Sequence, residues 1–142
     1  MRFKPLFLVL CAIPLSAGLA FYIFVDGLSQ RRPDIIELSA SRQYILERVP
    51  LRVFFSEGEL AYLRMTDLDE PKFIYRSPLY PIGQLDMSFV TIPGKISSST
   101  VDFNTEKKYF VFRADQWKEH WLNRFVSNTP YSIEPPVESK DK

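Results

Sequence analysis

The hydrophobic pattern divides the chain into one long apolar segment near its start and a mixed apolar and polar region behind it. Residues 5–25, PLFLVLCAIPLSAGLAFYIFV, carry no charge, and the residues before them include Arg2 and Lys4. An uncharged run of this length reaches the about 20 residues that a helix needs to cross a bilayer. We therefore predict a single transmembrane anchor over residues 1–25, with residues 6–25 in contact with lipid.

A cleavable signal peptide is the alternative interpretation of this segment. The stretch from Ser16 to Ala20 places small residues where a signal peptidase requires them. The apolar run nevertheless continues with Phe21 and Tyr22. Aromatic residues suit the last turn of a spanning helix at the membrane interface, whereas they have no evident role at an exposed mature end. We therefore expect the segment to be retained.

The charges at the two ends of the segment set its expected orientation. Arg2, Lys4 and the amino terminus precede it, and Arg31 and Arg32 follow it. Positive charge favours the cytoplasmic side, and the amino group adds to the charge in front of the segment. We expect a single-pass protein of the bacterial inner membrane, with a cytoplasmic N-terminus and a periplasmic C-terminal domain.

A polar linker and a helix are predicted directly behind the anchor. Residues 26–33 are mostly polar and end at Pro33, which suits the first position of a helix. The following stretch, DIIELSASRQYILERV, has apolar residues at helical spacing. Those residues are Ile35, Leu38, Ile45 and Val49. We predict a helix over 34–48, ended by Pro50.

From Leu51 onward the period changes to that of β-strands. Turn-forming residues separate about six apolar and alternating runs, which predict strands. Those runs are LRVFF and ELAYLRM on either side of a turn at Gly58, then KFIYRS, QLDMSFVTI, ISSSTVDF and KKYFVF. The expected fold class is α+β, with a small antiparallel meander that can curl into a partial barrel, flanked by two helices.

One predicted strand raises the question of an open sheet edge. The run from Ile96 to Val101 contains neither charge nor proline, the features that usually protect an edge. At an edge, its backbone could pair with a strand of a partner protein. The alternative is an ordinary strand with a polar face inside the sheet. Ile96 and Val101 are therefore candidate partner-binding residues.

The second predicted helix carries an aromatic stripe. In ADQWKEHWLNRFVSN, Asp115 is a suitable N-cap, and Trp117, Trp121 and Phe125 recur every four residues. The stripe either closes the core over the sheet or stays partly exposed and binds a partner, a role in which Trp is a frequent anchor. All three residues are candidate partner-binding residues.

The boundaries of the domain follow from these elements. We place an extracytoplasmic α+β domain at 34–129 and expect residues 130–142 to be a flexible tail, because Pro135, Pro136 and alternating charges follow one another there. The aromatic content is 15%. It suffices for a packed core and would also permit a cavity for a small apolar ligand.

Charge and cysteine content exclude several classes of function. The chain has 18 Lys and Arg against 17 Asp and Glu, and two of the basic residues precede the apolar segment. The domain is thus slightly acidic, which argues against nucleic acid as a partner. The only cysteine, Cys11, lies inside the apolar segment. An intramolecular disulfide and a cysteine-ligated zinc site are excluded, and we expect no cofactor.

Catalysis has few candidate residues. His120 is the only histidine, and no glycine-framed nucleophile motif accompanies it. Asp67 and Asp69 form the densest acidic turn, without the glycine and spacing of a calcium loop. A small hydrolase of the cell envelope would have to use these three side chains, and it would need a cleft that brings them together.

The predicted architecture favours a binding function over catalysis. One anchor and a small exported domain without catalytic groups are typical of accessory proteins that bind and stabilise a membrane regulator, a sensor or an envelope complex. The same layout occurs in immunity proteins or inhibitors that neutralise an exported toxin. We expect a non-enzymatic accessory protein, with the immunity protein and the small envelope hydrolase as alternatives.

Overall fold

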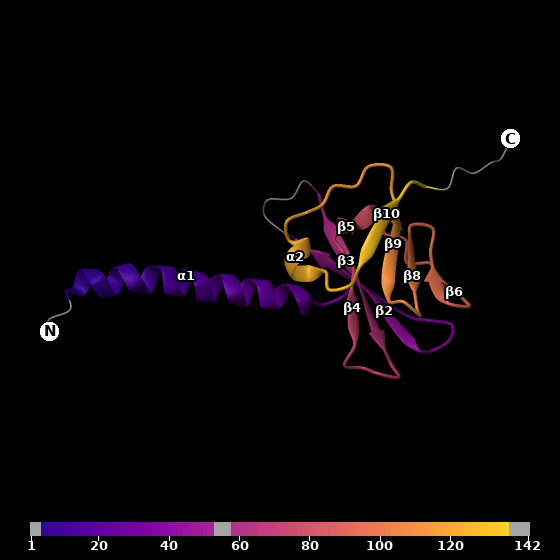
Figure 1. The fold of residues 1–142 in the computed structure, drawn as a ribbon, viewed down its shortest axis with the longest axis horizontal. Coiled ribbons are helices and arrows are strands. Elements are labelled where there is room, and N and C mark those ends of the chain that lie inside the picture. The colour runs from indigo at the N-terminus through magenta and orange to yellow at the C-terminus, as the bar shows by residue number, and fades with distance from the viewer. Residues whose placement is uncertain (1–3, 53–57, 137–142) are drawn as a thin grey trace.

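The computed structural model describes residues 4–52 and 58–136, and it has an α+β fold with one long helix beside a β-rich domain (Figure 1). Helix α1 spans Pro5–Ser29. It projects from one side of the domain, and the short helix α2 (Asn123–Val126) lies beside its domain-proximal end. The expected fold class is thereby confirmed at this level.

Two five-stranded sheets replace the single meander that the sequence predicts. In sheet A the first four strands pair antiparallel in chain order, and β5 pairs with β3. Its strands are β1 (Ile35–Leu38), β2 (Tyr44–Leu51), β3 (Leu60–Asp67), β4 (Ile74–Arg76) and β5 (Tyr80–Pro81). A 3-10 turn, Ile82–Gln84, leads toward the second sheet. Strands β1 to β4 and strands β6 to β9 each form an antiparallel meander, and the two sheets do not join into a closed barrel within the described residues.

Sheet B continues the antiparallel order and ends with one parallel strand. Its strands are β6 (Val90–Ile92), β7 (Lys95–Ser97), β8 (Val101–Asn104), β9 (Tyr109–Arg113) and β10 (Tyr131–Glu134). Strand β10 pairs parallel with β9, with Tyr131 opposite Phe110. The sequence predicts a flexible tail from residue 130 onward, whereas residues 131–134 complete the sheet.

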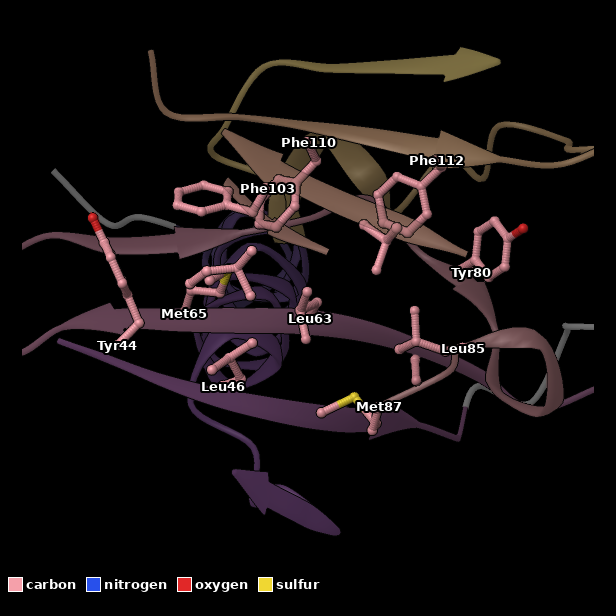
Figure 2. Packing of buried hydrophobic residues seen from close by; sticks show 13 residues of the cluster. Tyr44, Leu46, Leu63, Met65, Tyr80, Leu85, Met87, Phe103, Phe110 and Phe112 are labelled. Carbon is pink, nitrogen blue, oxygen red and sulfur yellow. The ribbon is translucent and has the colours of Figure 1, made fainter. Parts of the chain in front are cut away.

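The main core lies between the two sheets. Phe103, Phe110 and Phe112 of sheet B face Leu46 and Leu63 of sheet A (Figure 2). Phe103 and Phe110 have ring centroids 4.9 Å apart, and Tyr80 stacks on Phe112 at 5.0 Å. These side chains fill the space between the two sheets.

A second, smaller core covers part of the outer face of sheet A. Leu28 from the end of α1 and Leu122 and Val126 from the α2 region pack there against side chains of β2 and β3. The buried β-strand residues of this cluster are Val49, Leu51 and Tyr62. Sheet A is therefore buried on both faces at this end, and the end of α1 belongs to the domain.

The helix predicted over 34–48 is wrong, because these residues form the hairpin of β1 and β2. Strand β2 turns Tyr44 and Leu46 toward the main core and Val49 and Leu51 toward the second core. A strand that is buried first on one face and then on the other has apolar residues three apart at the crossover, which imitates helical spacing. Arg42, at φ 57°, forms the turn and could not continue a helix.

The helix predicted over 114–128 is also largely wrong, because only Asn123–Val126 is helical. The residues buried in this region are Leu122 and Val126, not the aromatic stripe. The ring nitrogen Nδ1 of His120 accepts a hydrogen bond from the Leu122 backbone N–H at 3.2 Å. In an α-helix the Leu122 N–H would donate to a backbone carbonyl, so its bond to the His120 side chain replaces a helical hydrogen bond.

The single edge strand predicted at 96–101 is wrong, because the structure has parts of two strands and a turn there. Ile96 belongs to β7 and Val101 to β8, and residues 98–100 form the turn between them. Both strands lie inside sheet B, between β6 and β9. The turn is tight because Ser98 N–H donates to the carbonyl of Val101 at 2.8 Å. The polar run therefore reflects a turn and does not leave an edge open.

The remaining predictions have mixed outcomes. The strands predicted at 59–65, 72–77 and 107–112 are present as β3, β4 and β9, whereas only the end of the run 84–92 forms β6. Gly58 has the expected positive φ, 98°. The strand predicted at 51–55 falls mostly outside the described residues. The linker predicted at 26–33 is helical up to Ser29.

Candidate functional site

Helix α1 carries the first functional feature, an apolar surface that the domain does not cover. The helix has 25 residues and a mean hydropathy of 2.3 in its most apolar window. It is long and apolar enough to cross a membrane, and a signal sequence would satisfy the same criteria. Within α1 only Leu28 is buried. The other apolar side chains therefore need lipid or another protein around them.

The junction between α1 and the domain is built from buried contacts. Leu28 has no exposed surface, and its carbonyl oxygen accepts a hydrogen bond from the Tyr62 hydroxyl at 2.7 Å. Burial raises the pKa of the Tyr62 hydroxyl, so that it remains a neutral donor. Because both groups are buried, α1 and sheet A are fixed to each other at this point.

Arg64 adds a charged contact at the same junction. Its guanidinium pairs with Glu47 through Nε at 2.7 Å and Nη2 at 3.2 Å, and its Nη1 donates to the carbonyls of Ser29 and Arg31. The hydrogen bond to Glu47 raises the pKa of Arg64. This arginine therefore ties the segment after α1 to strands β2 and β3.

Aromatic side chains continue the apolar surface of α1 onto the domain. Phe21 meets Phe125 edge to face at 5.7 Å, and Phe125 meets Trp121 at 6.2 Å. We call Phe21, Trp121 and Phe125 the aromatic junction. Trp121 is 54% exposed. His120 stacks on Trp121 at 5.9 Å and lines, with this cluster, an open hollow of about 600 Å³.

Trp117 does not belong to this cluster. Its indole N–H donates to the carbonyl of Leu79 at 3.1 Å, and its ring packs against Tyr131 and the main core. The predicted stripe thus separates into one residue inside the domain and two beside α1. Ile96 and Val101 are fully buried in the main core and present no surface to a partner.

The outer face of sheet A carries a second apolar surface, which sequence reasoning missed. Strand register places Leu38 opposite Ile45, Ile45 opposite Thr66, and Thr66 opposite Ile74. Side chains of directly opposed residues share a face. Ile36 precedes Leu38 by two residues in β1 and therefore lies on the same face, where it is 64% exposed. We call Ile36, Leu38, Ile45 and Ile74 the outer-face row.

The outer-face row is the uncovered part of the face that receives α1. Tyr62 and Val49 on the same face lie under α1 and α2, whereas Leu38 is 53% exposed and Ile74 38%. The row begins at β1, which pairs with β2 and, among residues 4–52 and 58–136, has no strand on its other side. In the sequence, the row is indicated by the apolar residues Ile36 and Leu38, which lie two apart as on one face of a strand. This spacing has meaning only once the segment is recognised as a strand and not as a helix.

The three candidates for hydrolytic chemistry have separate neighbours. Asp67 is nearly buried and pairs with Lys108 at 3.7 Å, and its carboxylate accepts the Asp69 backbone N–H. His120 contacts Trp121 and Leu122 beside α2. No contact described for Asp67 or Asp69 is shared with His120. Over residues 4–52 and 58–136, no group of three or more His, Cys, Asp or Glu side chains is placed to hold a metal ion.

A cluster of charged side chains around Asp102 joins three strands of sheet B. Asp102, 9% exposed, accepts hydrogen bonds from Arg113 and Ser97, and Lys95 approaches it at 3.4 Å. Arg113 also donates to the Ser98 carbonyl at 3.1 Å. These bonds tie β7, β8 and β9 together and leave the carboxylate fully occupied.

Comparison with known proteins adds no family: no family model, curated protein or solved structure matches this chain. The features of the chain that bear on function are α1, its junction with the domain and the exposed apolar surfaces.

Proposed function

We propose that this chain is a non-enzymatic, single-pass protein of the bacterial inner membrane whose periplasmic domain binds and stabilises another membrane protein. The observation that carries the proposal is that an exposed apolar helix of 25 residues continues, without a break, into the buried Leu28 of the domain. Cleavage after Gly18 or Ala20 would leave Leu28 in place, so the case for a retained anchor rests on the length and apolar surface of α1. The buried Leu28 fixes the end of that helix beside sheet A, where a partner in the same membrane can reach the domain.

The outer-face row is the surface that we assign to the partner. An exposed, contiguous apolar surface on a small domain usually marks a binding site. The row shares its sheet face with the end of α1, so a protein that covers it lies close to the membrane. This position favours a membrane protein over a soluble one as the partner.

The β1 edge offers a second means of recognition beside the row. A strand of the partner could add to β1 through backbone hydrogen bonds, while its apolar side chains cover Ile36 and Leu38. Separate environments for Asp67 and His120 support a binding role over hydrolysis, because acid–base catalysis requires its groups within reach of one substrate.

A cross-linking experiment tests this assignment. A photoreactive amino acid replaces Leu38 in one variant and Val90 in a matched control. Val90 is apolar, similarly exposed and also on an edge strand, but it belongs to sheet B. Both variants are expressed as full chains, irradiated in intact cells, and analysed after carbonate extraction of the membranes, together with the intact mass of the chain.

We expect an intact, carbonate-resistant chain and a cross-link from position 38 to an integral membrane protein, several-fold stronger than from position 90. Replacement of Ile36 and Leu38 by Glu should also lower the abundance of that partner. A cross-link from position 38 to a secreted soluble protein would instead support the immunity or inhibitor function. A mass beginning after Gly18 or Ala20 would contradict the retained anchor.

A further inference from the structure

We infer that Trp121 and Phe125 of the aromatic junction enter the headgroup interface of the membrane that α1 crosses, so that the domain rests directly on lipid. This inference rests on the proposed function, because it takes α1 as a spanning helix. It replaces the expectation that the two residues bind a partner protein.

The length of α1 sets the depth of the junction. A spanning helix needs about 20 residues at a rise of about 1.5 Å per residue. Counted from Pro5, such a span ends close to Phe24, whereas α1 continues to Ser29. Phe21 therefore lies in the last turn of the span, at the depth where aromatic side chains gather in membrane proteins.

The contact geometry brings the domain to the same depth. Phe125 packs edge to face on Phe21, and Trp121 packs on Phe125. A side chain that touches Phe21 from the domain cannot stay far outside the interface when Phe21 is inside it. Trp121 is more than half exposed, and burial of its ring in lipid would remove apolar surface from water, while the indole N–H can reach headgroups.

The charges around the cluster suit a lipid headgroup region. Lys118 and Arg124 are exposed on either side of Trp121 and can meet lipid phosphates. Glu119 lines the same hollow as the rings, and its carboxylate accepts a hydrogen bond from the Tyr131 hydroxyl at 3.3 Å. The combination of apolar rings with flanking cations is the chemistry of an interfacial membrane contact. We therefore commit to lipid as the occupant of this surface.

Tryptophan quenching tests the inference, since the chain contains two tryptophans in different environments. The full chain is reconstituted in vesicles of phosphatidylethanolamine and phosphatidylglycerol. Part of the lipid is replaced by phosphatidylcholine brominated on the acyl chain, either near the headgroup or near the chain end. Fluorescence of the wild type is compared with W121F, which retains Trp117, and with W117F, which retains Trp121.

We expect quenching by the shallow bromine in the wild type and in W117F, and at least a twofold loss of that quenching in W121F. The wild type and W121F suffice for the test if W117F does not fold, because the Trp121 signal is their difference. Equal quenching in the wild type and W121F would overturn the inference. If that result came from an intact, carbonate-resistant chain, the proposed function would stand, whereas a cleaved or extractable chain would overturn both.

Discussion

Replacement of Leu28 by Ala measures how firmly α1 is joined to the domain. Leu28 is fully buried between Val49 and Tyr62 of sheet A and Leu122 of the α2 region. The substitution removes the apolar contacts of a buried leucine and leaves a cavity, a change that costs about 2–5 kcal/mol in comparable cores. We expect the free energy of unfolding to fall by about 3 kcal/mol, since the second core is small and can partly close around the cavity.

Urea unfolding of the full chain in mild detergent, followed by tryptophan fluorescence, provides the measurement. With a slope of about 1–3 kcal/mol per molar urea, a loss of this size lowers the midpoint by roughly 1–3 M. Leu19→Ala is the matched control, because it makes the same change in the same helix at a side chain that is 60% exposed. We expect the control to stay within about 0.5 kcal/mol of the wild type.

Equal midpoints for L28A and the wild type would refute the reasoning. Such a result would mean that a flexible segment connects α1 to the domain, as the mostly polar residues 26–33 suggest. The contacts between α1 and sheet A would then contribute nothing to the stability of the domain.

Two further predictions concern charged groups of the domain. Asp102→Asn should lower the free energy of unfolding by about 3 kcal/mol, because it leaves the mostly buried Arg113 without its counter-charge, and the same urea titration measures it. The second prediction concerns acid pH: the hydrogen bond from Arg48 lowers the pKa of Asp34 below 3.8. The contribution of this carboxylate to stability is therefore present above its unfolded pKa and is lost as the pH falls through the folded pKa. Asp34→Asn should reduce the fall of the thermal midpoint in acid, and an identical pH profile for the wild type and D34N would contradict the assignment.

The sequence predicts the fold class and most strands because their signals are local. Turn residues surround β3, β4 and β9, and alternation within each of them identifies a strand. The failures occur where tertiary packing decides. Strand β2 exchanges its buried face between Leu46 and Val49, because the second core begins there, and no local preference distinguishes this pattern from a helix.

The candidate site was predictable only in part, for a similar reason. The regular spacing of Trp117, Trp121 and Phe125 predicts one shared face, yet Trp117 reaches the Leu79 carbonyl while Phe125 contacts Phe21. Their separation depends on where α1 and sheet A meet. The sequence offers no sign of that meeting, because the decisive residue, Leu28, stands among polar neighbours.

The second core also has a consequence for the order of folding. It joins Leu28, near the start of the chain, to Leu122 and Val126, which are synthesised much later. Contacts between such distant segments form only after the intervening chain is available, and they slow folding. Until Leu122 and Val126 are synthesised, Val49 and Tyr62 lack part of their cover. The emerging chain therefore presents an unfinished apolar sheet face, and a chaperone that shields such surfaces should bind it during this interval and release it once α2 packs.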